Sequence, residues 1–476
     1  WGSYAVCGHF GGDSSPIRDV HLMQPGQRVS GSRREGGGWE LKTSFGRTVD
    51  DVVLAGSALR TGSMTQALDL AADGITGALV SAADLSDGEV SLGLSGGKDS
   101  RLIAASFIAA GRLPRFNTNV DTPAEGETAA RLLQTVRETR DLEPVHRLYN
   151  AGAPATVLQT GLRERVQRLQ RQHDLQGAST YTVRVPAPAR LPATTRAMSF
   201  TGAGGELATG YWYPAAGDDQ DDAVAREAAT VHLLGSDAPV QDHVLEAERA
   251  RISAVLDHAG SLGLRGAELC DYLYLVERVR RWYTSGYVLG IVTPFLSPGF
   301  VTASFALTPA AKRRRVLHVG LLARYVPEWL EVPYVSVSTG RSSATRVWEG
   351  DGLQVLCDLH DTHRGDLPRL LRRDDVDRAL EDAATGKATK RQEKTLQQLA
   401  WLAVASETLE PASVLAVEPT TYAGLLAARP APSPQRTVPA VPPAVTLIAS
   451  RVRFVKRTRL GRKAWAAARS RLLTAA

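Results

Sequence analysis

The stretch Ser-Gly-Gly-Lys-Asp-Ser at residues 95–100 lies between an apolar run, residues 90–94, and a run with helical spacing that begins at Arg101. This order predicts a strand, a glycine loop and a helix. Glycines allow close backbone approach, and the first turn of a helix leaves amide groups that favour an anion. The two serines add hydroxyl donors, and Asp99 is a typical ligand of Mg²⁺. The stretch therefore predicts a site for Mg²⁺ and a polyphosphate such as ATP.

The loop differs from the Walker A motif, which needs a glycine five residues before its Gly-Lys pair and a Ser or Thr directly after it. Here Leu92 and Asp99 occupy those positions. The stretch instead resembles the signature of the PP-loop ATP pyrophosphatases, which cleave ATP to AMP and pyrophosphate. The alternative is an ordinary glycine turn between a strand and a helix. The agreement of strand, loop chemistry and helix favours the PP-loop interpretation.

The composition is that of a globular protein. Its 476 residues suffice for two to three domains, with 43% hydrophobic and 22% charged residues. There is no apolar run of membrane-spanning length, no secretory signal and no metal or disulfide spacing among Cys7, Cys270 and Cys357. We therefore expect a cytoplasmic location. Because the first methionine is Met23, we also expect the sequence to be a piece of a longer protein.

Positive charge is concentrated at the C-terminal end. Residues 451–476 hold nine Lys and Arg and no acid, which exceeds the whole net charge of +6. Residues 447–476 interleave these cations with apolar side chains, which predicts a basic amphipathic helix for an anionic membrane surface, a protein partner or nucleic acid. A solvated extension is the alternative. Nothing else resembles an RNA-binding module, so we do not expect nucleic acid to be the partner.

Strand and helix patterns alternate along the chain. Apolar spacing predicts helices over 63–83 and 127–137, and short apolar runs predict strands over 90–94 and 116–120. A second strand followed by glycines lies at 197–206, and residues 220–330 and 352–428 are mostly helical in pattern. The alternation predicts an α/β fold with a doubly wound parallel sheet and a helical C-terminal part.

Three further motifs follow the loop in order. They are Thr-Gly-Ala-Gly-Gly-Glu-Leu-Ala-Thr-Gly-Tyr at 201–211, Thr-Pro-Phe-Leu-Ser at 293–297, and Leu-Thr-Pro at 307–309 leading to Lys312 and to Tyr-Val-Pro at 325–327. Together with the loop they resemble the asparagine synthetase and β-lactam synthetase branch of the PP-loop superfamily. The resemblance implies a PP-loop, adenine nucleotide α-hydrolase-like sheet. Residues 18–30 also resemble the end of that family's N-terminal glutaminase domain.

The resemblance and the composition together divide the chain into five regions. We expect a glutaminase-like remnant at 1–45, an asparagine-synthase-like PP-loop domain at 46–345 and a helical region at 346–428. A proline-rich linker follows at 429–446, and the basic amphipathic tail at 447–476 ends the chain.

Residue roles follow from the same resemblance. It implies that nucleotide is bound by Leu94, Ser95, Gly96, Gly97, Lys98, Asp99, Ser100, Thr118, Thr201 and Gly202. It implies Asp99 and Glu206 as Mg²⁺ ligands, and we take Lys312 and Arg341 as catalytic cations. Lys312 and the arginines at 278, 280 and 281 are also candidates to contact a carboxylate substrate or phosphate. The alternatives are a helix-dipole acid for Glu206, a solvated lysine for Lys98, a plain core strand at 116–119, and acid-paired surface cations for Lys312 and for the arginines at 278, 280 and 281.

Three departures concern the amine-handling half of the family site. Family members carry a lysine in the loop after the helix that ends near Pro327, but residues 332–346 hold only Arg341 and Arg346 as cations. Ala203 stands where asparagine synthetases have a glutamate, and Ser297 stands where they have an aspartate. The phosphate-binding half therefore matches the family better.

These observations predict an ATP-dependent amide-forming ligase. ATP with Mg²⁺ would adenylate a small-molecule carboxylate with release of pyrophosphate, and ammonia or an amine would then displace AMP. Since Cys7 lies inside the glutaminase-like segment, we interpret it as structural and expect a separate or missing glutaminase. The alternatives are a catalytically degenerate nucleotide-binding protein and a PP-loop enzyme that acts on RNA.

Overall fold

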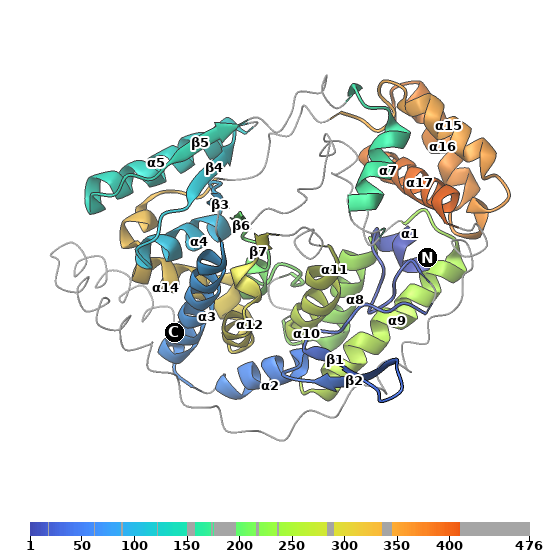
Figure 1. The fold of residues 1–476 in the computed structure, drawn as a ribbon. Helices are drawn as coiled ribbons and strands as arrows, with labels where there is room; N and C mark the ends of the chain where they lie inside the picture. The colour runs from blue at the N-terminus through green and yellow to red at the C-terminus, as the bar shows by residue number, and fades with distance from the viewer. Residues whose placement is uncertain are drawn as a thin grey trace.

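A five-stranded parallel sheet forms the centre of one half of the molecule, the sheet half, in the order β5-β4-β3-β6-β7 (Figure 1). The computed structural model describes residues 1–409 except 18, 61, 87–88, 121, 150–157, 173–174, 176–196, 216–218, 236–237, 283–289 and 336–344. The sheet confirms the predicted α/β class. Its strands are β3 (Val90–Gly93), β4 (Arg115–Asn119), β5 (His146–Tyr149), β6 (Met198–Phe200) and β7 (Ile291–Val292).

The strand order reverses at β3. From β3 the chain builds one side of the sheet with β4 and β5, and then crosses to the other side with β6 and β7. β3 and β6 are therefore neighbours, with Leu92 in register with Phe200. In doubly wound sheets, ligands bind outside the carboxyl ends of the strands at such a reversal. The first glycine loop (residues 94–97) and the second glycine loop (residues 201–204) both begin there.

Helices from several parts of the chain build the core around this sheet. Apolar side chains of the strands, such as Leu92 and Phe116, share one buried cluster with Leu321 of α14. The rings of Phe107 on α4 and Phe200 on β6 meet edge to face at 4.8 Å. This packing holds the two glycine loops in a fixed relation. The helices are α3 (Met64–Leu85), α4 (Lys98–Ala109), α5 (Pro123–Arg140), α12 (Pro298–Phe305) and α14 (Val316–Tyr325).

A second buried cluster is almost wholly helical. It joins Tyr4 of α1 and Trp401 of α17 to the helices that follow residue 221, so parts of three predicted regions share one core. Gln398 of α17 donates a hydrogen bond to the carbonyl of Ala5. The helices of this half are α1 (Gly2–Cys7), α7 (Leu162–Gln172), α8 (Asp222–Leu234), α9 (Asp242–Ser261), α10 (Ala267–Leu273), α15 (Gly352–Thr362), α16 (Arg373–Ala384) and α17 (Lys390–Thr408).

Short elements connect the two halves. A π-helical turn, Tyr274–Val279, continues α10 into α11 (Arg280–Trp282), and α13 (Pro309–Arg313) precedes α14. The helix α2 (Val49–Leu59) begins at a capping box formed by Thr48 and Asp51. Single turns of 3₁₀ helix lie at Gly205–Ala208, Pro294–Leu296, Pro327–Glu331 and Leu367–Arg369.

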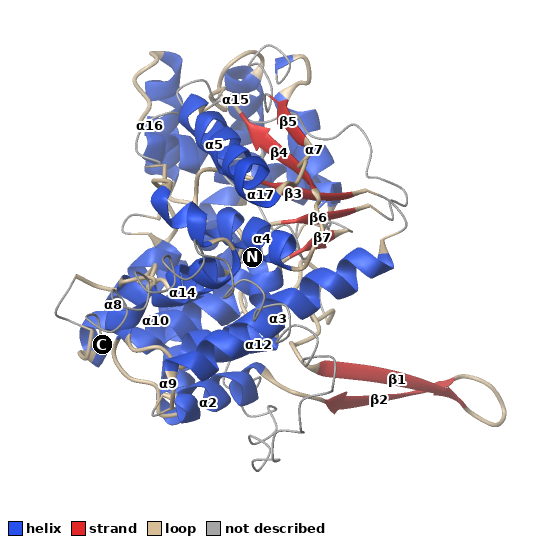
Figure 2. Cartoon of the chain, turned by 90° about the vertical axis from the view of Figure 1, so that its left-hand side faces the viewer, coloured by secondary structure: helices blue, strands red, loops and turns tan. Residues whose placement is uncertain are grey.

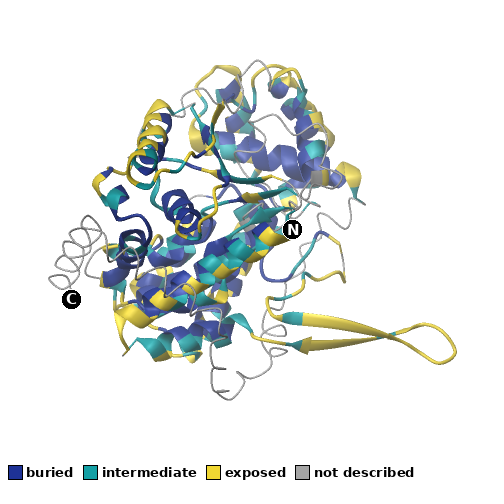
Figure 3. Cartoon of the chain, turned by 60° about the vertical axis from the view of Figure 1, so that its left-hand side comes forward, coloured by how far each residue is buried: buried dark blue, intermediate teal, exposed yellow. Residues whose placement is uncertain are grey.

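A two-stranded antiparallel ribbon projects from the body (Figure 2). It consists of β1 (Gln27–Arg33) and β2 (Trp39–Phe45), and most of its residues are exposed (Figure 3). The predicted Pro-Gly turn precedes this ribbon, and Gly26 adopts a left-handed φ of 82° there.

The predicted helix at 127–137 is longer in the structure because Pro123 starts it and Asp141, at a left-handed φ of 52°, ends it. Residues 410–476, with the predicted linker and basic tail, lie outside the described residues. Within the described part of the chain, no helix has both the length and the apolar character needed to cross a membrane.

Candidate nucleotide site

The first glycine loop is shaped by its own serines. The amide of Ser95 donates to Ser100 Oγ at 3.1 Å, and the two serine oxygens lie 2.9 Å apart. The amide of Gly97 donates to Ser95 Oγ at 3.2 Å. Gly97 is also the N-cap of α4 and offers no side chain to cap it. The loop is therefore preformed, and the first turn of α4 keeps the positive end of its dipole uncapped.

The second glycine loop packs directly on the start of α4. A Cβ atom at Gly202 would lie 2.8 Å from Asp99 Cβ, and one at Gly205 would lie 2.1 Å from Asp99 Oδ1. Gly204 between them has a left-handed φ of 89°. Larger residues would push the loops apart, so the glycines of residues 201–205 are needed for this close approach. The structure thus brings Thr201, Gly202 and Asp99 together, as the sequence predicted.

Asp99 is held by two side chains. Its Oδ1 lies 2.8 Å from His318 Nε2, and its Oδ2 accepts a hydrogen bond from Lys98 Nζ at 2.7 Å. Burial opposes ionisation of Asp99, but the contacts with His318 and Lys98 outweigh it and lower the pKa of the carboxyl below its ordinary value. Asp99 is therefore a carboxylate at neutral pH, the form that a metal ion requires.

The donor set fits Mg²⁺ bound mainly by phosphate oxygens. Glu206 directly follows Gly205, which contacts Asp99, and its Oε2 accepts a hydrogen bond from the amide of Gly204 at 3.1 Å. No group of three or more His, Cys, Asp or Glu side chains among the described residues is arranged to hold a metal. Mg²⁺ commonly takes only one or two protein carboxylates when phosphate supplies the rest. Asp99 and Glu206 match that pattern.

Thr118 binds the start of the first glycine loop. Its hydroxyl donates to the carbonyl of Leu94 at 2.7 Å and lies 2.8 Å from His146 Nε2. The histidine nitrogen must then be the donor to Thr118, because the hydroxyl has only one hydrogen. Thr118 is buried, so the structure shows it fixing Leu94 at the end of β3.

An apolar side chain covers the first glycine of the loop. The amide of Val335 donates to the carbonyl of Gly96 at 3.2 Å, and a Cβ at Gly96 would lie 2.1 Å from Val335 Cγ2. Val335 lies in the region after Pro327 where the family places a lysine. Arg341 lies outside the described residues, and Arg346 is paired with Glu393 at 2.7 Å.

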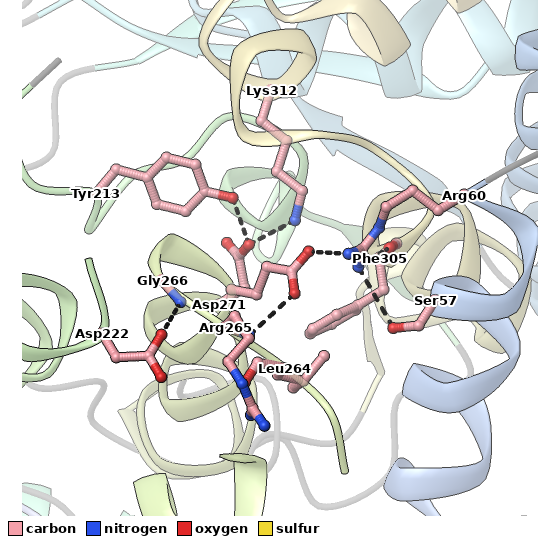
Figure 4. A network of polar contacts seen from close by, with 11 residues as sticks. Ser57, Arg60, Tyr213, Asp222, Leu264, Arg265, Gly266, Asp271, Phe305 and Lys312 are labelled. Carbon is pink, nitrogen blue, oxygen red and sulfur yellow. Dashed lines mark hydrogen bonds and ion pairs between the residues drawn. The ribbon is translucent and has the colours of Figure 1, made fainter. Parts of the chain in front are cut away.

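Lys312 lies in a buried polar network (Figure 4). Its Nζ lies 2.6 Å from Asp271 Oδ2, and the hydroxyl of Tyr213 donates to the same oxygen at 2.5 Å. Its side chain is only 2% exposed. These contacts join α13 and α10 to the chain that follows the second glycine loop. The predicted catalytic role of Lys312 stays a prediction, since its charge is already neutralised by Asp271.

The other predicted substrate cations bind backbone. Arg281 donates to the carbonyls of Gly12 and Ser14 at 2.7 Å each. Arg280 donates to the carbonyl of Met23 at 3.1 Å. The structure therefore gives both a part in anchoring residues 12–23 to the helical half.

Cys7 ends α1 and lines a cavity of about 30 Å³ with Lys394 and Trp401. Burial raises the pKa of its thiol to about 12. A protonated thiol is a poor nucleophile, which agrees with a structural role for Cys7.

Two residues near the start of α14, His318 in the helix and Arg315 at its N-cap, were not predicted from the sequence. His318 has no motif around it, and only the fold shows its contact with Asp99. Arg315, in the run of arginines at 313–315, is exposed and has a left-handed φ of 56°, an unusual conformation for arginine. It lies one turn before His318, and its guanidinium is 6.0 Å from the ring of Tyr334, the neighbour of Val335. Arg315 is therefore an exposed cation near Tyr334, which precedes the residue that contacts Gly96.

The chain matches no known protein-family model, and no curated protein matches it.

Proposed function

We propose that the protein is a PP-loop ATP-dependent ligase that adenylates a carboxylate and passes it to ammonia or an amine. One observation carries the proposal: two glycine loops leave neighbouring parallel strands where the strand order reverses, and they meet at an ionised aspartate. Such a place combines uncapped helix amides, close backbone approach and a metal-binding carboxylate. These are the parts that an ATP site needs.

In this proposal each residue of the site has a separate role. Ser95 and the first turn of α4 bind the phosphates, and Thr201 with Gly202 flanks the ribose or adenylate. Asp99 and Glu206 would hold Mg²⁺, which supplies positive charge to neutralise the pyrophosphate as it leaves. Arg315, near Tyr334, adds an exposed cation. His318 and Thr118 hold Asp99 and Leu94 in place.

The chemistry consists of two displacements. An oxygen of the substrate carboxylate attacks the α-phosphorus of ATP, and the bond to the bridging oxygen breaks to release pyrophosphate. The nitrogen of ammonia or an amine then attacks the acyl carbon, loses a proton and displaces AMP. Adenylation provides the leaving group that a free carboxylate lacks.

A nucleotide-binding protein without ligase activity is the second candidate. The contact of Val335 with Gly96 favours it, because an apolar side chain lies where family members bring a lysine near the loop. In this case ATP binds, but the adenylation transition state lacks a cation that family members supply.

ATP–pyrophosphate exchange separates the two candidates. A panel of small carboxylates is supplied one by one with Mg²⁺, ATP and labelled pyrophosphate. The ligase predicts carboxylate-dependent exchange and, with an amine present, stoichiometric AMP release. Asp99→Asn should abolish exchange, while Asp84→Asn, which alters an exposed acid paired with Arg112, should not. ATP binding without exchange for any carboxylate would favour the second candidate.

A further inference from the structure

Arg101 is a buried guanidinium directly behind the first glycine loop. It is only 1% exposed and lies one turn into α4. It donates to the carbonyl of Gly96 at 3.3 Å, to that of Pro333 at 2.9 Å and to that of Trp329 at 3.2 Å. A further bond reaches the carbonyl of Val332. One side chain thus ties the loop to the segment 329–333.

Carbonyl groups and one aromatic ring surround this cation. The ring of Tyr334 lies 4.2 Å from the guanidinium carbon. No acidic side chain within the described part of the chain forms an ion pair with Arg101, and its Nε has no hydrogen-bond partner there. Burial lowers the pKa of Arg101, but a guanidinium keeps its proton in proteins. Within the described residues, this positive charge is therefore balanced by carbonyl dipoles and not by a carboxylate.

The position of this charge gives it an effect on the loop. The carbonyl of Gly96 that Arg101 binds belongs to the same peptide group as the amide of Gly97. A hydrogen bond from a cation polarises that peptide and strengthens the bond that its N–H donates to Ser95 Oγ, which keeps the loop in its preformed shape. The charge also adds to the positive end of the α4 dipole. The added positive charge favours an anion at the loop.

We propose that Arg101 is a positioning residue that makes the first glycine loop selective for ligands with several phosphate groups. The inference rests on the proposed function in taking this loop as the phosphate site. It adds that affinity rises with each phosphate because of a charge that never touches the ligand. The charge of Arg101 therefore raises phosphate affinity, in addition to the hydrogen bonds by which Arg101 holds the loop in place.

The test compares affinities across a series of phosphates. Dissociation constants are measured by calorimetry with Mg²⁺ for adenosine, AMP, ADP, ATP and inorganic pyrophosphate. For Arg101→Gln we expect ATP and pyrophosphate to lose about tenfold or more, AMP to lose less and adenosine to be unchanged. Arg101→Lys loses some of the carbonyl hydrogen bonds but keeps the charge, so its ATP affinity should stay within about threefold of that of the unaltered protein.

Arg165 on α7 provides the matched control. It is equally buried and donates to the carbonyl of Thr160, far along the chain from the loop. Arg165→Gln should lower stability without any dependence of affinity on phosphate number. Circular dichroism verifies that each variant is folded. If Arg101→Gln does not fold, Arg101→Lys decides: a loss above tenfold, equal for adenosine and ATP, would overturn the proposal.

Two other results bear on it. An equal loss across the series in Arg101→Gln, or no loss, would mean that the charge has no role. If the unaltered protein binds neither ATP nor pyrophosphate, the phosphate site and this proposal fail together. If it binds pyrophosphate with the expected dependence on Arg101 but catalyses no exchange, only the ligase proposal fails.

Discussion

Lys312 and Arg101 are both fully buried cations, but their surroundings differ. Lys312 faces the carboxylate of Asp271 and a tyrosine hydroxyl, so its charge is cancelled where it lies. Among the described residues, the groups that contact the Arg101 guanidinium are carbonyl groups and the ring of Tyr334. A buried charge is costly unless it is compensated. The charge of Lys312 is thus balanced within the fold, whereas our proposal is that an anionic ligand completes the Arg101 region.

Removal of Asp271 tests whether this carboxylate balances the buried charge of Lys312. Asp271→Ala leaves the ammonium of Lys312 buried without its carboxylate, and we expect a loss of about 3–5 kcal/mol in the free energy of unfolding. Urea denaturation followed by circular dichroism measures it. The double variant Asp271→Leu with Lys312→Met should recover much of the loss. A small loss in Asp271→Ala would show that the pair is not the main support of this region.

Lys312→Met should cost less, about 1–3 kcal/mol, because the remaining acid can take up a proton. Burial already raises the pKa of Asp271 despite the nearby ammonium. We expect ATP affinity to stay unchanged, which the calorimetric series measures. Intact stability together with loss of exchange activity would instead support the catalytic role predicted from the sequence.

A change at His318 tests the proposed Mg²⁺ site, because this residue contacts Asp99. Its ring is buried, its Nε2 contacts Asp99, and its Nδ1 has no hydrogen-bond partner within the described residues. His318→Leu should raise the Mg²⁺ concentration that half-maximal ATP binding requires about tenfold. Removal of a residue that holds a metal ligand in place typically has an effect of this size. Titration of Mg²⁺ at fixed ATP measures it. His318→Asn keeps an N–H donor and should recover part of the affinity; equal loss in both variants would argue against a positioning role.

The smallest expected effect lies at the edge of the sheet half, where Arg140 binds Glu328 at 2.6 Å. Burial opposes ionisation of Glu328, but the hydrogen bond and the charge of Arg140 together with hydrogen bonds from backbone and Thr139 outweigh it and lower the pKa below the ordinary 4.5. The folded state therefore binds fewer protons than the unfolded state just below pH 4.5. This contribution to stability is complete above that pH and is lost as the pH falls through the lowered pKa.

Glu328→Gln should therefore reduce stability at pH 7 and flatten the acid side of the stability curve. Denaturation midpoints from pH 3 to 7 measure both. Curves that differ by the same amount at every pH would contradict the assigned cause.

The elements that could be predicted from the sequence are those whose geometry depends on residues close together in the chain. The strand, glycine loop and helix around residues 90–109 are neighbours in the chain, and their residue types fix their geometry. The meeting of the two glycine loops was also predictable, because parallel strands place their carboxyl ends at one edge of the sheet.

The contacts that define the rest of the site join distant parts of the chain. His318 reaches Asp99 across 219 positions, and Arg101 reaches Val332 across 231 positions. No local spacing signals such pairs. Lys312 had the residue type of a catalytic cation, and only burial beside Asp271 showed another use for its charge.

The central claim is that Asp99 and the two glycine loops bind Mg²⁺ and ATP. Calorimetric titration of ATP with Mg²⁺ and then with EDTA tests it most directly, in the unaltered protein and in Asp99→Asn. The account predicts binding that needs Mg²⁺ and that falls at least tenfold in Asp99→Asn, while Asp84→Asn binds normally. Equal ATP affinity in the unaltered protein and Asp99→Asn, or binding indifferent to Mg²⁺, would contradict it.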